Sequence, residues 1–204
     1  MSIRSFKTSS IKTGEKRSKF WDQSAVIVSG AYEAIASATG TGSSGTITFS
    51  SIPATYQHLQ IRCLIRCDEA ANAYRDLRIR LNGDTGTNYN AHLLYGDGTS
   101  AISTHRADAN TYTYITAGLD AYPRNLVTAN VMGVAIIDIH DYASTSKNKT
   151  TRQVLGVDNN GAGRVFMSSG LWRSLSAINS VSIISEAGNW TTQSQFALYG
   201  IKGA

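Results

Sequence analysis

The sequence has few charged residues, two cysteines and no long apolar run, and each scarcity excludes a class of protein. Charged residues make up 16% of the 204, below the roughly 25% of ordinary soluble domains. No stretch of about 18 apolar residues exists to cross a bilayer, and no apolar stretch near the N-terminus resembles a secretion signal. We therefore expect no membrane partner, and a protein made and folded in a cytoplasm.

Two cysteines are too few for a disulfide framework or a metal cluster. Cys63 and Cys67 are four apart in a segment that alternates as a strand, so their side chains point the same way about 13 Å apart. At that distance they cannot bond to each other. We expect two reduced, buried thiols, with a bond to another chain left open, and neither a metal nor a cofactor.

The positive charge is concentrated at the start of the chain. The first 20 residues hold six of the 19 basic residues and only Glu15 of the 14 acidic ones, so they carry the whole net charge of +5 and leave 13 of each sign for the remainder. A nucleic-acid binder needs basic side chains spread over a folded face, so no specific nucleic acid is expected. The predicted partner-binding residues are Arg4, Lys7, Lys12, Lys16, Arg17, Lys19, Phe20 and Trp21.

The remainder of the chain alternates apolar and polar residues with a period of two, which is typical of strands. Strands are expected near 46–49, 58–67, 77–81, 112–115, 131–140, 152–157, 164–168, 181–185 and 195–201. We predict an all-β fold, an antiparallel β-sandwich or jelly roll with an extended N-terminal arm. The expected parts are a basic attachment arm at 1–24, a linker with a short strand or turn at 25–45, and the β-domain at 46–204.

Three strings resemble chemical sites but lack the partners that such chemistry needs. Asp84 begins an Asp-Thr-Gly string, of which an aspartic protease needs two copies; Asn82 and Gly83 before it instead predict a tight turn of the type that hairpins use. Asp138, His140 and Asp141 end a strand without a specified third metal ligand, so a polar strand terminus capping a turn is favoured. Residues 158–163 are rich in oxygen ligands but lack calcium-site spacing, and a loop suffices. We predict no catalytic residues and no enzyme.

Two groups of side chains leave alternatives open. Arg62, Arg66, Arg78 and Arg80 either make a basic outer face or belong to polar faces with acidic neighbours, and we favour the second. Exposed aromatic rings could form a sugar-binding platform, although core or subunit contacts are the favoured role for these rings. The rings are Tyr89, Tyr95, Tyr112, Tyr114, Trp172 and Trp190.

Several blocks, taken in order, resemble a family of structural proteins of tailed bacteriophages. They are residues 47–53, 55–62, 81–86, 88–89, 136–139, 141–143, 168–172 and 195–202. Members of that family are similar to head-decoration, head-fibre or tail-appendage proteins. The basic segment with Phe20, Trp21 and Asp22 resembles an N-terminal attachment piece that some members carry, and the resemblance implies no catalytic residues.

The resemblance and the charge pattern together predict a virion component that binds the major capsid protein or another virion protein. Basic side chains would meet an acidic shell surface, and Phe20 with Trp21 would supply the buried anchor. Because a shell presents many equivalent sites, we expect a homotrimeric capsid cement or decoration protein. The alternatives are a tail or fibre component, or a carbohydrate-binding module that recognises a host glycan.

Overall fold

The structure, a computed structural model, describes residues 31–203 apart from 71–73, 112, 115–121 and 124–127. The predicted attachment arm lies outside the described residues. The described residues form antiparallel strands and no helix, which confirms the predicted all-β class. None of them therefore forms a helix of the length and hydropathy that a membrane span requires.

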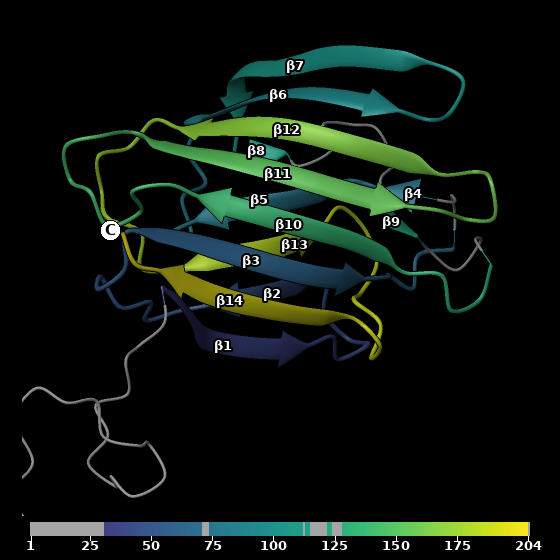
Figure 1. The fold of residues 1–204 in the computed structure, drawn as a ribbon, viewed down its shortest axis with the longest axis horizontal. Helices are drawn as coiled ribbons and strands as arrows, with labels where there is room; N and C mark the ends of the chain where they lie inside the picture. The colour runs from purple at the N-terminus through teal and green to yellow at the C-terminus, as the bar shows by residue number, and fades with distance from the viewer. Residues whose placement is uncertain (1–30, 71–73, 112, 115–121, 124–127, 204) are drawn as a thin grey trace, which may run out of the picture. The chain divides into compact units, whose positions relative to one another are not determined.

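The larger sheet has eight strands and faces the viewer in Figure 1. Its β1 and β7 are edge strands, and β10 and β11 lie near its middle. In spatial order the strands are β1 (Tyr32–Thr39), β14 (Gln195–Ile201), β3 (His58–Ile65), β10 (Gly133–Ile139), β11 (Lys149–Val157), β12 (Arg164–Trp172), β6 (Tyr89–Gly96) and β7 (Ala101–Asn110).

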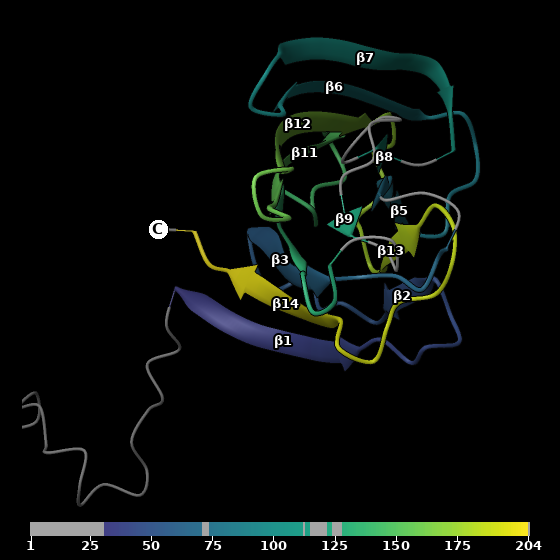
Figure 2. The same ribbon diagram turned by 90° about the vertical axis from the view of Figure 1, so that its right-hand side faces the viewer.

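A smaller sheet forms a second layer behind it, as the turned view in Figure 2 shows. It consists of β2 (Thr46–Phe49), β13 (Val181–Ser185), β5 (Leu77–Leu81) and β8 (Thr113–Tyr114). The short strands β4 (Tyr74–Arg75) and β9 (Tyr122–Pro123) pair separately. Two antiparallel sheets that share one core make a β-sandwich.

The core lies between the two sheets, because the period-two alternation points every second, apolar side chain of a strand inward. In β3, Leu59, Ile61 and Cys63 point inward, and in β5, Leu77 and Ile79 do the same. All five are no more than 3% exposed. Burial of a large aliphatic side chain contributes about 1.5–3 kcal/mol, so this alternation sets the register of both sheets. Cys67 is also buried, and both cysteines are free thiols, as predicted.

The turn after β5 has the conformation predicted for it, but it joins different sheets. Asn82 and Gly83 have positive φ angles of 51° and 66°, and the Asp84 N–H donates to the Leu81 carbonyl at 3.0 Å. Positive φ at both central positions is the geometry of a tight hairpin turn. Here the chain crosses from β5 in the smaller sheet toward β6 in the larger one instead of forming a hairpin.

Two strands of the larger sheet are absent from the sequence prediction, and a third lies in the expected linker. β6 and β7 pair at one edge of the sheet, and β1 pairs with β14 at the other. The glycine and serine run at 40–45, at the end of the expected linker, is a loop.

Candidate functional site

The outer face of the larger sheet carries large apolar side chains where polar ones are usual. Strands β3, β10, β11, β12 and β6 alternate between buried and more exposed positions, with the exposed positions on the side away from the smaller sheet. Seven apolar side chains at these positions are between 36% and 63% exposed: Leu64, Leu94, Val134, Ile136, Val154, Val165 and Met167. A solvated sheet face is ordinarily polar, so this face is a candidate contact surface.

These seven side chains, called the apolar stripe below, form two neighbouring rows across five strands. In one row, Leu64 is paired with Val134, and Gly156 connects Val134 to Val165. The next row runs from Ile136 through Val154 and Met167 to Leu94. From their fractional exposures the stripe presents on the order of 500 Å² of apolar surface, near the upper end for a monomer.

A polar row borders the apolar stripe. It runs in register through Asp138, Arg152, Ser169, His92 and His105. The Arg152 guanidinium donates to Asp138 Oδ2 at 2.9 Å, so the two charges on this row compensate each other. The row therefore adds polar contacts to the face without an unpaired charge on Asp138 or Arg152.

A shallow hollow of about 510 Å³ lies where the polar row meets the apolar stripe. His92, His105 and Arg152 line it together with Leu94 and Met167. The two imidazoles stack with ring centroids 5.7 Å apart. The hollow thus offers hydrogen-bonding groups beside an apolar floor, which suits a protein side chain as well as a small ligand.

The four histidines of the chain form two pairs. His92 faces His105 across β6 and β7, and the ring of His58 lies edge-on to that of His140 at 5.1 Å. The two residues of each pair are well separated in the sequence, so local sequence spacing does not reveal the pairs.

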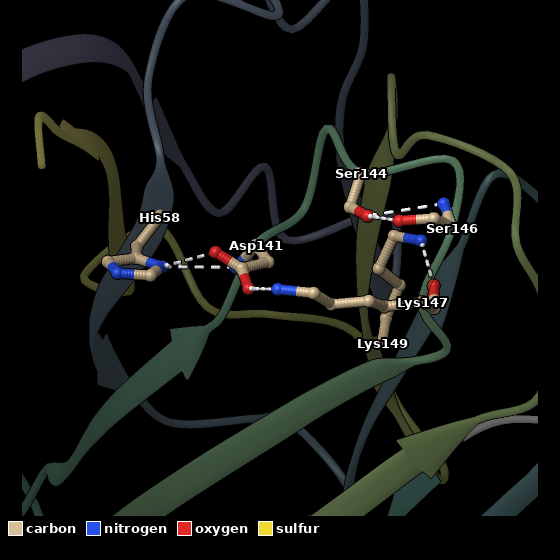
Figure 3. Close-up of polar contacts among 6 residues, drawn as sticks. All are labelled: His58, Asp141, Ser144, Ser146, Lys147 and Lys149. Carbon is tan, nitrogen blue, oxygen red and sulfur yellow. Dashed lines mark hydrogen bonds and ion pairs between the residues drawn. The ribbon is translucent and has the colours of Figure 1, made fainter.

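The predicted polar strand terminus at 138–141 contains the end of β10 at Ile139 and a turn at His140 and Asp141, and Figure 3 shows how Asp141 is held. Asp141 has a positive φ of 46°, and its N–H donates to His58 Nδ1 at 3.0 Å. Lys147 Nζ donates to Asp141 Oδ2 at 2.7 Å, which lowers the pKa of that carboxyl below its usual value. These contacts fix the loop between β10 and β11, consistent with the predicted capping role.

Lys149 is fully buried at the start of β11. Its Nζ donates to the carbonyl of Lys147 at 2.7 Å (Figure 3). Burial lowers the pKa of Lys149, because desolvation penalises the charged amine, while the charge of Asp141 opposes that effect. The buried amine holds the loop backbone at a desolvation cost.

Asp84, the first residue of the protease-like string, is a structural acceptor. Its carboxylate accepts hydrogen bonds from Trp172 Nε1 at 2.7 Å, Asn88 Nδ2 at 2.9 Å and the Gly86 N–H at 2.7 Å. Partial burial favours a raised pKa, but these three donors outweigh it and the pKa of Asp84 lies below its ordinary value. This is the turn chemistry expected from the sequence, with Trp172 as a partner that the sequence did not reveal.

The four arginines do not form one basic face. Arg62 lies on the outer face of the larger sheet, between the rings of Tyr32 and Tyr199, and Arg66 is buried. Arg78 pairs with Glu186 at 3.0 Å on the smaller sheet, and Arg80 donates to the Thr111 carbonyl. Arg78 has the acidic neighbour that the favoured interpretation predicts, whereas the burial of Arg66 contradicts its predicted place on a polar outer face.

Four of the six rings considered for a sugar platform are buried. Tyr89 and Trp190 are 0% exposed, and Tyr95 and Trp172 are below 9%. Of the other two, Tyr112 and the Tyr114 side chain are outside the described part. The core role favoured for the four described rings is confirmed.

The predicted 158–163 segment is a loop between β11 and β12. Asp158 Oδ1 accepts a hydrogen bond from the Gly161 N–H at 3.0 Å, and Asn160 and Gly161 both have positive φ. Within the described part of the chain, no three or more His, Cys, Asp or Glu side chains cluster closely enough to hold a metal ion.

The predicted attachment residues, from Arg4 to Trp21, lie outside the described residues, so their role stays a prediction. Searches among known proteins found no matching family model, no similar curated protein and no similar solved structure. The outer face of the larger sheet is the candidate site that the structure adds to the sequence analysis.

Proposed function

We propose that this chain is a non-enzymatic structural protein of a tailed-bacteriophage virion, and specifically a capsid cement or decoration protein. In this proposal residues 1–24 attach it to the major capsid protein or another virion protein, and the sandwich self-associates. The observation that carries the proposal is a contrast between two parts of the chain. Residues 1–24, called the leader below, hold six basic and two acidic side chains, whereas the β-sandwich has an apolar outer face.

The properties of the body support an assembly role. Its residues after Phe20 carry equal numbers of acidic and basic side chains, so non-specific attraction to a charged surface is weak. The strings that resemble chemistry, at Asp84 and at Asp138 to Asp141, are held in turns by hydrogen bonds and ion pairs. The apolar stripe is instead suited to contact with a protein surface.

The composition of the leader supports attachment to an acidic surface. Six basic side chains attract the leader to an acidic surface and fix its position there. Phe20 and Trp21 provide apolar anchors of the kind that dominate binding energy. A self-associating body presents several leaders at once, which raises the effective affinity for a shell with repeated sites.

The experiment is co-sedimentation of the full chain with particles that lack it, at low and high salt. The charge reversal Lys16→Glu, Arg17→Glu and Lys19→Glu should weaken attachment at low salt, and the difference should shrink at high salt because ions screen the contact. The control for the single variant Lys19→Glu is Lys147→Glu, which makes the same change of charge on the sandwich. The Lys147 side chain is 65% exposed, and this control should bind particles as the wild type does. Equal binding of all variants would contradict the proposal.

A tail or fibre component is the second candidate within the same class. The apolar stripe serves equally well as a contact between copies in a tail structure, so the body does not decide between head and tail. Immunogold labelling of intact particles separates them, because cement proteins label the whole head and tail components label one end.

A further inference from the structure

We propose that the apolar stripe is the contact between two copies of this chain, which pack face to face about a twofold axis lying in the plane of the interface. This deepens the self-association in the proposed function, on which its biological meaning rests, and it replaces the three copies expected from the sequence with two. The occupant of the face is therefore a second copy, and the argument comes from area, charge and register.

The area of the face fits a contact between copies. A standard interface covers about 800 Å² on each partner, of which somewhat more than half is apolar. The apolar stripe supplies on the order of 500 Å², and the polar row beside it supplies much of the rest. Stacked sheets are a common packing mode, with strand directions within about 30° of each other.

The charges of the face favour a like partner. Asp138 and Arg152 compensate each other at 2.9 Å, and the body as a whole has no net charge, so two copies meet without electrostatic repulsion. A strongly charged partner would find no matching field on this face.

The register makes the face self-complementary. An in-plane axis that crosses β11 at Leu155 and β12 at Phe166 exchanges the two rows of the stripe, because both residues lie between the rows. Val165 then faces Met167 of the second copy, and Val154 faces the space above Gly156 of the second copy. Most of the large apolar side chains thereby lie over each other or over a glycine, and Leu64 lies over Arg62 of the second copy.

The same axis matches charges on the two sides of Leu155. Arg152 and Asp158 lie three residues on either side of Leu155, so each Arg152 faces the Asp158 of the second copy. Asp158 follows the last residue of β11 and is exposed. The contact therefore places two symmetric ion pairs at the rim of an apolar centre, which is the ordinary anatomy of an interface.

Sedimentation velocity of the full chain, from about 1 to about 100 µM, tests the proposal directly. We expect the mass of two copies, and a Val165→Lys, Met167→Lys double variant should have the mass of one copy with an unchanged circular dichroism spectrum. These positions are 63% and 56% exposed in the single copy, so lysine there should not prevent folding. Leu175→Lys, at an apolar residue that is 54% exposed outside the stripe, should leave the two-copy mass unchanged.

Asp158→Asn tests the register. Asparagine keeps the oxygen that accepts the Gly161 N–H but loses the charge that faces Arg152, so association should weaken several-fold and lose most of its salt dependence. An association constant equal to that of the wild type at low salt would rule out this alignment.

Three results would overturn the proposal: the mass of one copy at every concentration, as expected if residues 1–30 cover the face; the mass of three copies; or a two-copy mass that the double lysine variant leaves unchanged. These measurements contain no particles. Failure of the chain to bind virions would therefore count against the proposed function and leave the two-copy contact intact. A one-copy mass would count against the two-copy contact and leave attachment through residues 1–24 intact.

Discussion

Replacing Asp84 by alanine should destabilise the sandwich although Asp84 is not in the hydrophobic core. The carboxylate accepts from Trp172 Nε1, Asn88 Nδ2 and the Gly86 N–H at 2.7–2.9 Å. The Trp172 side chain is 3% exposed, so its N–H has little access to water when the acceptor is removed. The variant therefore leaves a buried donor unsatisfied in addition to losing the turn contacts.

The expected cost is about 2–4 kcal/mol, since a hydrogen bond to a charged group contributes about 1.5–3 kcal/mol and an unsatisfied buried donor adds to the loss. For a domain of this size that corresponds to a decrease in Tm of roughly 4–15 °C. In a Trp172→Phe background, which keeps the ring stacked on Tyr89 but lacks the donor, the same substitution should cost about 1–2 kcal/mol less.

The cost should also depend on pH. The folded-state pKa of Asp84 lies below its ordinary value of 3.8, so the stabilisation is complete above about pH 4 and is lost as the pH falls through the folded value. Chemical denaturation of the wild type and of Asp84→Ala at pH 7 and at pH 3 measures both effects. A free-energy difference that is below about 0.5 kcal/mol at pH 7, or that does not shrink at pH 3, would refute this reasoning.

Three further predictions concern buried groups. Lys149→Met should stabilise the fold at pH 7 by about 1 kcal/mol. This advantage should shrink as the pH rises toward 10.5, because burial lowers the folded pKa of Lys149 and the wild type regains stability once the amine is neutral. Chemical denaturation of both proteins at pH 7 and pH 10 measures the difference. Burial raises the pKa of Cys63 to about 12, and Cys67 is also fully buried, so a thiol reagent at pH 8 should label both only after unfolding. Gly200→Ala should lower the Tm by several degrees, since a Cβ there would lie 2.3 Å from the ring of Tyr56, and differential scanning calorimetry measures it.

The sequence predicts the strands whose two faces differ in polarity. Alternation in the segment from His58 marks β3, and that around Ile79 marks β5, because inward apolar and outward polar side chains follow each other. β1 lacks this contrast: its alanines are small on both faces, and most of its residues are exposed at the sheet edge. β6 alternates, with Tyr89 and Leu93 inward, but the outward Leu94 weakens the pattern.

The apolar outer face could not be predicted from the sequence, because its strands also lack a contrast in polarity between their two faces. A segment such as β10, with Val134 and Ile136 outward, is apolar on both sides, and sequence alone does not distinguish a doubly buried strand from one with an apolar exposed face. The neighbour of Asp84 could not be predicted either, because Trp172 is 88 residues away and reaches it only through the packing of β12 on β6.

The central proposal is that the chain is part of a virion shell, and cryo-electron microscopy of particles purified from cells that make this chain tests it most directly. We predict density for the sandwich at regularly repeated positions on the head, joined to the capsid protein by residues 1–24. Particles whose heads carry no such density, although the protein is made during infection, would contradict it.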